Sequence, residues 1–277
     1  GRARWLRWGW LVVTLGLVVF VSAGSLDNYF SDPRYARDDY RGMARYIEAI
    51  EEPNDAILIN APGQYETFVY YYQGDLPLYP LPHQRPIDVA VTEGDLEEML
   101  AGRRYVYAIF WASDESDAER YIEGWLDLHT YKALDTWYGN VRLAVYAVPQ
   151  GQASSRPAQP VEARFSDQIL LRTYSLLTPE VRSGEVLQLG LTWEALTAIE
   201  QRYKVFIHVL GPEGNIFGQR DAEPGGGAKI TTTWTPGEMI EDNHGVFILP
   251  GTPPGTYRLV LGLYDLETGG RLPIMGP

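Results

Sequence analysis

The hydrophobic period changes once along this chain of 277 residues, and the change limits the folds that the chain can adopt. Before about residue 150, short apolar runs such as 55–62 alternate with amphipathic stretches such as 116–129, whose apolar residues recur at helical spacing. After about residue 160, apolar and polar residues alternate one by one, as in 185–195. The first pattern predicts helices layered on a buried sheet, and the second predicts antiparallel strands. We therefore expect two domains of different class.

The first domain is predicted over 27–150 as a small α/β, Rossmann-like layered domain with a partly parallel sheet. Its predicted helices are 39–52, 63–74, 92–102 and 116–129, and its predicted strands are 55–62, 103–113 and 140–149. Thr92 followed by Asp95 is close to a capping box, so we expect Thr92 to be a helix N-cap. No G-x-G-x-x-G fingerprint follows any of these strands, which argues against a nucleotide cofactor.

The second domain is predicted over 161–277 as an immunoglobulin-like antiparallel β-sandwich. A stretch rich in Pro, Gln, Ser and Ala at 151–160 has no apolar periodicity and predicts a linker. Beyond it, about seven or eight strand-like segments are separated by turn sequences such as PEGN, TPPG and ETGG, as in a single sandwich. The expected fold class is thus α+β and multidomain.

The N-terminal segment 1–26 is predicted to be a transmembrane helix with a basic flank. No charged residue occurs at positions 8–26, a length that comes close to spanning a bilayer core of about 30 Å. Arg2, Arg4 and Arg7 precede the apolar stretch, so the rule that positive residues stay inside places everything after about residue 26 on the extracytoplasmic side of a cell membrane. A cleaved signal peptide or a buried core helix are the alternatives left open.

Composition excludes several classes of function. The net charge of −13 argues against a nucleic-acid partner, because binding a phosphate backbone needs clustered Lys and Arg. The chain has no cysteine, which rules out disulfides, zinc–thiolate sites and cysteine nucleophiles. No H-x-H or H-E-x-x-H motif is present. Glu241 and Asp242 with Asp221 give only a faint version of a calcium loop. We expect no cofactor, no metal and no catalytic residue in this chain.

Several long phrases carry a resemblance to a known family. They include YFSDPRYARDDYRGMARYIE at 29–48, WYGNVRLAVYAVP at 137–149 and TTTWTPGEMIED at 231–242. Together with the order span, α/β domain, linker and sandwich, these phrases resemble the C-terminal extracytoplasmic end of large bacterial membrane proteins of the glycosyltransferase family 39 type. Those proteins are relatives of the protein mannosyltransferases.

The resemblance implies a parent enzyme that transfers a sugar from a lipid-phosphate donor. In that family the catalytic acidic residues lie in an early loop of the membrane domain, and no position of this chain matches them. The chain is therefore expected to be a non-catalytic module that positions or binds an acceptor glycan, a lipid-linked sugar acceptor or a partner. The alternative is a single-span, surface-anchored protein that binds carbohydrate or protein and has no enzyme attached. Further apolar spans encoded upstream of Gly1 would favour the first hypothesis.

Six residues are candidate ligand contacts. They are Tyr70, Tyr72, Tyr79, His83, His208 and Gln219. The tyrosines near residue 70 offer rings on which a sugar could stack, and the proline-rich stretch 75–86 could present Tyr79 and His83 to a partner. Packing of the second helix and an ordered loop are the plainer interpretations of these segments.

His208 and Gln219 belong to a predicted hairpin. The strand 203–210 is followed by the turn sequence GPEGN and a returning strand, so His208 and Gln219 should lie near each other across the ladder if the hairpin closes at this turn. Architecture of the sandwich explains this pair more simply than catalysis does. The open question is whether the face of the sheet that carries His208 is covered.

Overall fold

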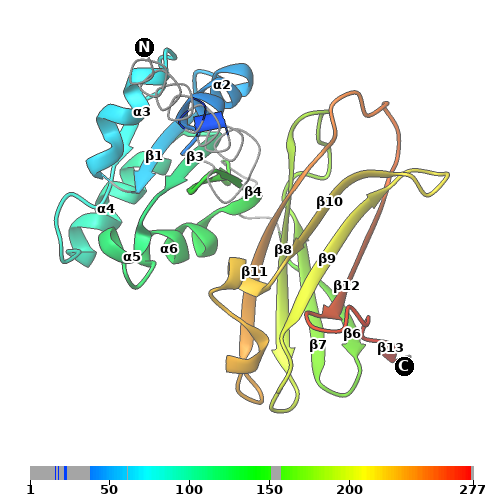
Figure 1. Ribbon diagram of the computed structural model, residues 1–277. Coiled ribbons are helices and arrows are strands. Elements are labelled where there is room, and N and C mark those ends of the chain that lie inside the picture. The colour runs from blue at the N-terminus through cyan, green and yellow to red at the C-terminus, as the bar shows by residue number, and fades with distance from the viewer. Residues whose placement is uncertain are drawn as a thin grey trace, which may run out of the picture.

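The computed structural model describes residues 38–60, 62–150 and 157–275, together with positions 16, 18, 22 and 23. Apart from those four positions, the membrane span predicted at 1–26 lies outside the described residues, as does most of the predicted linker. No helix within the described part of the chain is long and apolar enough to cross a membrane. Figure 1 shows a helix-bearing domain in blue to green beside a domain of long strands in green to red.

The first domain is built on one mixed sheet with the strand order β2-β1-β3-β5-β4. Its strands are β1 (Ala56–Asn60), β2 (Leu78–Pro80), β3 (Tyr105–Phe110), β4 (Tyr131–Tyr138) and β5 (Val141–Ala147). β1 runs parallel to both β2 and β3, whereas β5 is antiparallel to β3 and to β4. The partly parallel sheet that the sequence predicts is confirmed. The proline-rich β2 lies at an edge, where its missing backbone donor is tolerated.

Helices cover both faces of this sheet. α2 (Tyr40–Ile50) and α3 (Tyr65–Tyr71) lie on one face, α4 (Val89–Leu100) and α6 (Tyr121–His129) lie on the other, and the short η2 (Pro62–Gln64) and α5 (Ser113–Ser116) follow β1 and β3. Side chains of β1 alternate between the two cores: Ile57 and Ile59 pack toward α2 and α3, while Ala56 and Leu58 pack toward α4 and α6. A strand buried on both faces explains why 55–62 is uniformly apolar.

Two details of this domain differ from the prediction. α4 begins one turn before Thr92, because Asp88 is the N-cap and its carboxylate accepts a hydrogen bond from the Val91 backbone N–H. Thr92 is buried inside the helix instead. The strand β4 was not predicted at all, because Lys132 and Asp135 interrupt its apolar pattern.

The second domain is an antiparallel β-sandwich, as the two-residue alternation predicts. One sheet has the order β10-β9-β12 and the other β11-β8-β7-β6-β13. The strands are β6 (Gln159–Phe165), β7 (Ile169–Leu176), β8 (Val186–Ala195), β9 (Tyr203–Leu210), β10 (Ile216–Ala222), β11 (Met239–Phe247), β12 (Arg258–Asp265) and β13 (Ile274–Met275). Eight strands in the described residues agree with the predicted number. β6 begins at Gln159, inside the segment predicted as linker.

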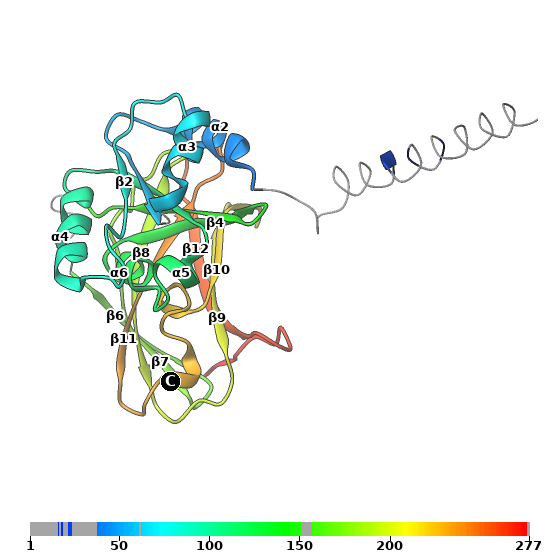
Figure 2. The same cartoon turned by 60° about the vertical axis from the view of Figure 1, so that its left-hand side comes forward.

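The two domains pack directly against each other along β4 and β11 (Figure 1, Figure 2). A Cβ placed on Gly245 of β11 would lie 2.7 Å from the Tyr131 carbonyl oxygen and 2.9 Å from the Ala133 Cβ, so only glycine allows this approach. Leu177 and Val186 of the sandwich belong to the same buried cluster as Tyr131 and Ala133 of the first domain. The hydrophobic core of the α/β domain therefore continues into the sandwich.

Candidate ligand-binding cleft between the domains

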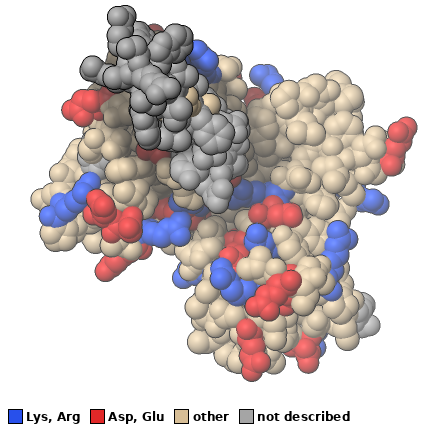
Figure 3. All heavy atoms as spheres, viewed as in Figure 1, with Lys and Arg blue, Asp and Glu red and all other residues tan. Residues whose placement is uncertain are grey.

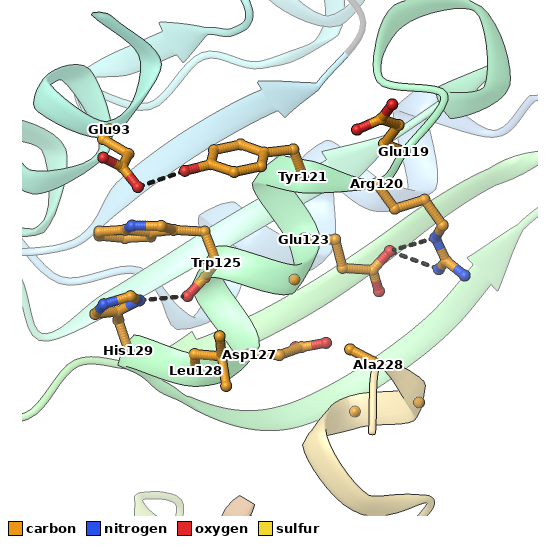
Figure 4. A pocket seen from close by; sticks show the side chains of 13 residues that line it. Glu93, Glu119, Arg120, Tyr121, Glu123, Trp125, Asp127, Leu128, His129 and Ala228 are labelled. Atoms are coloured by element: carbon orange, nitrogen blue, oxygen red, sulfur yellow. Dashed lines mark hydrogen bonds and ion pairs between the residues drawn. The ribbon is translucent and has the colours of Figure 1, made fainter. Parts of the chain in front are cut away.

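A cleft with a volume of about 540 Å³ lies where α6 meets the glycine-rich turn η4 (Pro224–Gly227) of the sandwich. Figure 4 shows α6 as one wall, with Glu93 of α4 above it and Ala228 opposite. Figure 3 shows charged side chains of both signs gathered along the line where the two halves of the molecule meet. Both domains thus contribute walls, which is a common position for a ligand site.

The start of α6 is held by Asp117. Its two carboxylate oxygens accept hydrogen bonds from the backbone N–H groups of Tyr121 (2.7 Å) and Ile122 (2.9 Å), which satisfies two donors that a helix N-terminus leaves free. Ile122 and Leu126 are fully buried against the sheet. This anchoring fixes which side chains of α6 face the cleft.

The aromatic wall of the cleft comes from Trp125 and His129, one helical turn apart. Their rings stack with centroids 4.1 Å apart and an interplanar angle of 20° (Figure 4). The His129 Nδ1 lies 2.7 Å from the Trp125 carbonyl oxygen. Because a carbonyl oxygen can only accept, Nδ1 carries the proton and Nε2 of the neutral ring is left as an acceptor.

Tyr121 and Glu93 form the upper rim. The Tyr121 hydroxyl donates a short hydrogen bond to the Glu93 carboxylate (Figure 4). This hydrogen bond, with smaller effects of burial and of the carboxylate charge, raises the pKa of Tyr121 to about 12. The phenol therefore stays protonated at physiological pH.

A cluster of buried charges lies beneath the cleft. The Lys132 ammonium sits 2.9 Å from Glu123 Oε1 and 2.8 Å from Asp127 Oδ1, and all three side chains are nearly inaccessible to solvent. Arg142 also contacts Glu123, and it lies 3.1 Å from Asp135. Each buried charge is thus paired, which is the condition for tolerating it in a protein interior.

The two carboxylates of this cluster titrate in opposite directions. Burial alone would raise the pKa of Glu123, but Lys132 and Arg142 outweigh it and lower the pKa to about 2. Asp127 has Lys132 but no arginine contact, so burial dominates, the charge of Glu123 adds to it, and its pKa rises to about 6. Asp127 is therefore the group in this cluster most easily protonated.

The glycine-rich turn closes over Asp127. A Cβ on Gly226, whose φ is +63°, would lie 2.3 Å from Asp127 Oδ2, so a side chain there would displace the carboxylate. The Gly225 backbone N–H donates to Asp242 Oδ1 at 2.8 Å, and the other oxygen of Asp242 accepts from the Trp193 indole N–H at 2.9 Å. Close packing of the two domains therefore explains the glycine at position 226.

The structure does not bring the six predicted ligand contacts together. Tyr70 is 76% exposed and meets the ring of Tyr71 edge-on, whereas Tyr72 is buried and donates a 2.7 Å hydrogen bond to Glu51. Tyr79 lies on the edge strand β2, where its hydroxyl accepts from Arg103 at 3.3 Å. The exposed His83 lies 3.5 Å from Asp95. None of these residues lines the cleft.

His208 and Gln219 are paired directly across β9 and β10, and this part of the prediction is confirmed. They lie on the outer face of the three-stranded sheet, away from the cleft, with His208 half-buried and Gln219 exposed. The neighbouring Phe206 is buried, and the Arg271 guanidinium sits 4.6 Å from its ring centroid. That face of the sheet is thus partly covered by a loop of its own domain.

The calcium hypothesis finds no support in the described residues. Asp242 is buried, and its carboxylate is taken up by Trp193 and Gly225, while Asp221 and Glu241 are exposed. No group of three or more His, Asp or Glu side chains in the described part of the chain is placed to hold a metal ion.

The residues of the cleft and of the buried cluster were missed for a physical reason. The helical spacing of apolar residues predicts that Leu128 lies on the buried face of the helix at 116–129, but Leu128 is 45% exposed, and Glu123 and Asp127 are buried instead. The signal was the spacing of Glu123 and Asp127, four residues apart on one helical face, with Lys132 just beyond the helix. That Arg142 also contacts Glu123 in this cluster of charges can be seen only in the folded structure.

No protein-family model and no curated protein matches the chain. Among solved structures, a calcium-binding mutant of Bacteroides uniformis beta-glucuronidase 2 shows 15% identity and a TM-score of 0.25 over 49% of this chain and 18% of that chain. A glycosyl hydrolase family 2 member from Bacteroides cellulosilyticus shows 10% identity and a TM-score of 0.26 over 50% of this chain and 20% of that chain. Similarities at this level carry no inference about function.

Proposed function

We propose that this chain is a non-catalytic, extracytoplasmic module of a polytopic membrane glycosyltransferase resembling family 39, and that it binds the acceptor glycan in the cleft between its two domains. In this proposal 1–26 is a membrane span of the parent protein, which transfers sugar from a lipid-phosphate donor. The phrases of sequence that resemble the family support the parentage. The α/β domain is proposed to be Rossmann-like, supported by the parallel pairing of β2, β1 and β3.

The cleft is the single observation that carries the binding role. Its volume of about 540 Å³ lies in the range of ordinary small-molecule sites. The exposed ring of His129, stacked on the buried Trp125, offers an aromatic face for the C–H groups of a sugar. Glu93, Glu119 and His129 Nε2 supply acceptors for sugar hydroxyls, and Arg120 supplies donors. A sugar has both an apolar face of C–H groups and hydroxyl groups that donate and accept hydrogen bonds, so it can use both kinds of contact.

Paired charges beneath the cleft support a pre-formed site. Glu123 and Asp127 are fixed by Lys132, and Gly226 packs on Asp127, so both walls of the cleft are held by the same cluster. A site that is ordered before binding avoids much of the entropy cost of ordering it on binding.

A glycan array with the full chain in detergent micelles tests the proposal. We expect binding to at least one glycan, weakened about tenfold or more by His129→Ala, because this variant removes the exposed ring of the aromatic wall. Tyr70→Ala is the control, because it removes an exposed ring outside the cleft and should leave binding unchanged. Absence of binding to any glycan would refute the binding role, and loss of binding only with Tyr70→Ala would move the site to α3.

A further inference from the structure

A second cavity of about 370 Å³ begins where the cleft ends. Leu128 and His129 line both cavities, so the C-terminal end of α6 is their shared wall. The second cavity continues onto the outer face of β7, β8 and β11. Resting on the proposed function, we propose that the two cavities form one groove that binds consecutive sugar units of an uncharged or amino-bearing oligosaccharide.

The floor of the second cavity is made of hydroxyl and amide groups. Thr173 of β7 and Thr192 of β8 pair across the strands, with their hydroxyl oxygens 2.9 Å apart. Each hydroxyl keeps acceptor capacity beyond this one bond. Asn243 of β11 donates its amide N–H to the Leu128 carbonyl oxygen at 3.0 Å, which ties the floor to the end of α6. The floor is thus polar and held in place.

Gly190 marks the point where three of these polar groups converge. A Cβ built on it would lie 2.7 Å from Ser175 Oγ, 3.4 Å from Asn243 Oδ1 and 3.8 Å from the Tyr131 hydroxyl. Burial raises the pKa of Tyr131 to about 12, so that hydroxyl remains a donor. The three groups come from both domains, so hydroxyl and amide groups gather at one point of the cavity lining.

Charge argues for an uncharged or amino-bearing ligand. Glu93, Glu119 and Glu241 line the two cavities and have no arginine or lysine contact in the described residues. The whole chain carries a net charge of −13. An anionic glycan would meet repulsion along the groove, whereas hydroxyl and ammonium groups find acceptors.

Titration calorimetry of the full chain in detergent micelles tests the groove with a ladder of probes. The probes are cello-, malto- and chito-oligosaccharides of increasing length, their monosaccharides, and polygalacturonate as the anionic comparison. We expect affinity to rise with length for one neutral series, and polygalacturonate not to bind. The double variant Thr173→Val/Thr192→Val keeps the shape of both side chains and removes both hydroxyls together, so folding should be nearly unchanged.

This double variant should reduce the affinity for the longer oligosaccharide about tenfold and leave the affinity for the monosaccharide unchanged. Thr197→Val, at an exposed loop position outside both cavities, is the matched control and should change neither. If glycans bind but length and the double variant have no effect, the extended groove is refuted and the single cleft stands. If polygalacturonate binds best, the inferred ligand class is wrong. If no glycan binds, the proposed function fails together with this inference.

Discussion

Two seams join the α/β domain to the sandwich, and their chemistry is opposite. The apolar seam consists of Tyr131, Ala133, Leu177, Val186 and Gly245, where β4 lies on β11 with a shared hydrophobic cluster. Its stability depends on complementary shape and on the apolar area that is buried, which contributes about 25 cal/mol per Å².

The charged seam consists of Glu123, Asp127, Lys132, Arg220 and Gly226, at the cleft side of the same interface. Burial lowers the pKa of Arg220 of β10 against the raising effect of the Asp135 and Asp127 charges, and its Nε has no hydrogen-bond partner among the described residues. Buried ion pairs add little net stability but are costly to break. The comparison suggests that the apolar seam holds the domains together and the charged seam fixes their orientation.

The largest expected effect comes from Lys132→Met in the charged seam. The substitution leaves Glu123 and Asp127 buried with less compensation, so the free energy of unfolding should fall by about 3–5 kcal/mol. Urea titration followed by circular dichroism measures it. Arg202→Met, which breaks the exposed pair with Glu223, is the matched control and should be nearly neutral. Equal effects of the two variants would contradict the distinction between buried and exposed pairs.

The second-largest effect is expected from Gly245→Val, which disturbs the packing of the apolar seam. Its side chain would meet the Tyr131 carbonyl oxygen and Ala133, and overpacking of this kind costs about 1–3 kcal/mol. We expect a lower melting temperature and faster proteolysis within 149–160, because the domains separate. Gly94→Ala lies in the interior of α4 with open space around it and should instead raise stability by about 0.5–1 kcal/mol. An unchanged melting temperature for Gly245→Val would show that the approach of β11 to β4 is not tight.

Gly226→Ala perturbs only the contact between the turn and Asp127. The alanine would have to keep the positive φ of Gly226, and its Cβ would displace the Asp127 carboxylate. We therefore expect the free energy of unfolding to fall by about 1–2 kcal/mol. The signal specific to the charged seam is hydrogen exchange at α6, which should rise for Gly226→Ala. Gly227→Ala also has a positive φ but meets no atom within 4 Å, and it separates backbone strain from the contact with Asp127.

The smallest effect concerns pH. The pKa of Asp127 is about 6 in the folded protein against 3.8 for the free group, so the folded state binds this proton more tightly. Its contribution therefore favours folding at low pH and is lost as pH rises from about 4 through 6, with about 1 kcal/mol of the loss falling between pH 5 and pH 7. Glu123 has a pKa of about 2 in the folded protein against 4.5 for the free group, so it acts in the opposite sense. Its contribution to stability is lost as pH falls from 4.5 toward 2.

Melting curves at pH 5 and pH 7 measure this linkage. The wild type should lose more stability over that interval than Asp127→Asn, because the variant has no group to titrate there. A steeper pH dependence in Asp127→Asn than in the wild type would overturn the assignment of this proton to Asp127.

Much of the fold could be predicted from local pattern. The alternation of Leu189, Leu191 and Trp193 on one face of β8 requires no knowledge of partners, and all three residues are buried as expected. The turn sequence GPEGN places His208 near Gln219, and a register shift between Ile216 and Gly218 makes the two residues direct partners. Periodicity reports which face of an element is buried, and turn chemistry reports register.

The candidate site could not be predicted, because it depends on contacts between distant segments. Asp127 and Gly226 lie far apart in the sequence, and the residues around either one do not indicate that the two are in contact. β4 was missed because Lys132 and Asp135 are polar residues that are satisfied by partners on α6 and β5. Polar residues in a core look like surface residues until their partners are known.

The shared apolar cluster has a consequence for how the chain can be divided. The stretch 149–160 separates two sequence periods, yet Tyr131 and Ala133 on one side of it are covered by Leu177 and Val186 on the other. A fragment that ends at this stretch would expose those side chains to water, and the other fragment would expose its half of the same cluster. The boundary in the sequence is therefore not a boundary in folding, and the two halves should unfold in one cooperative transition.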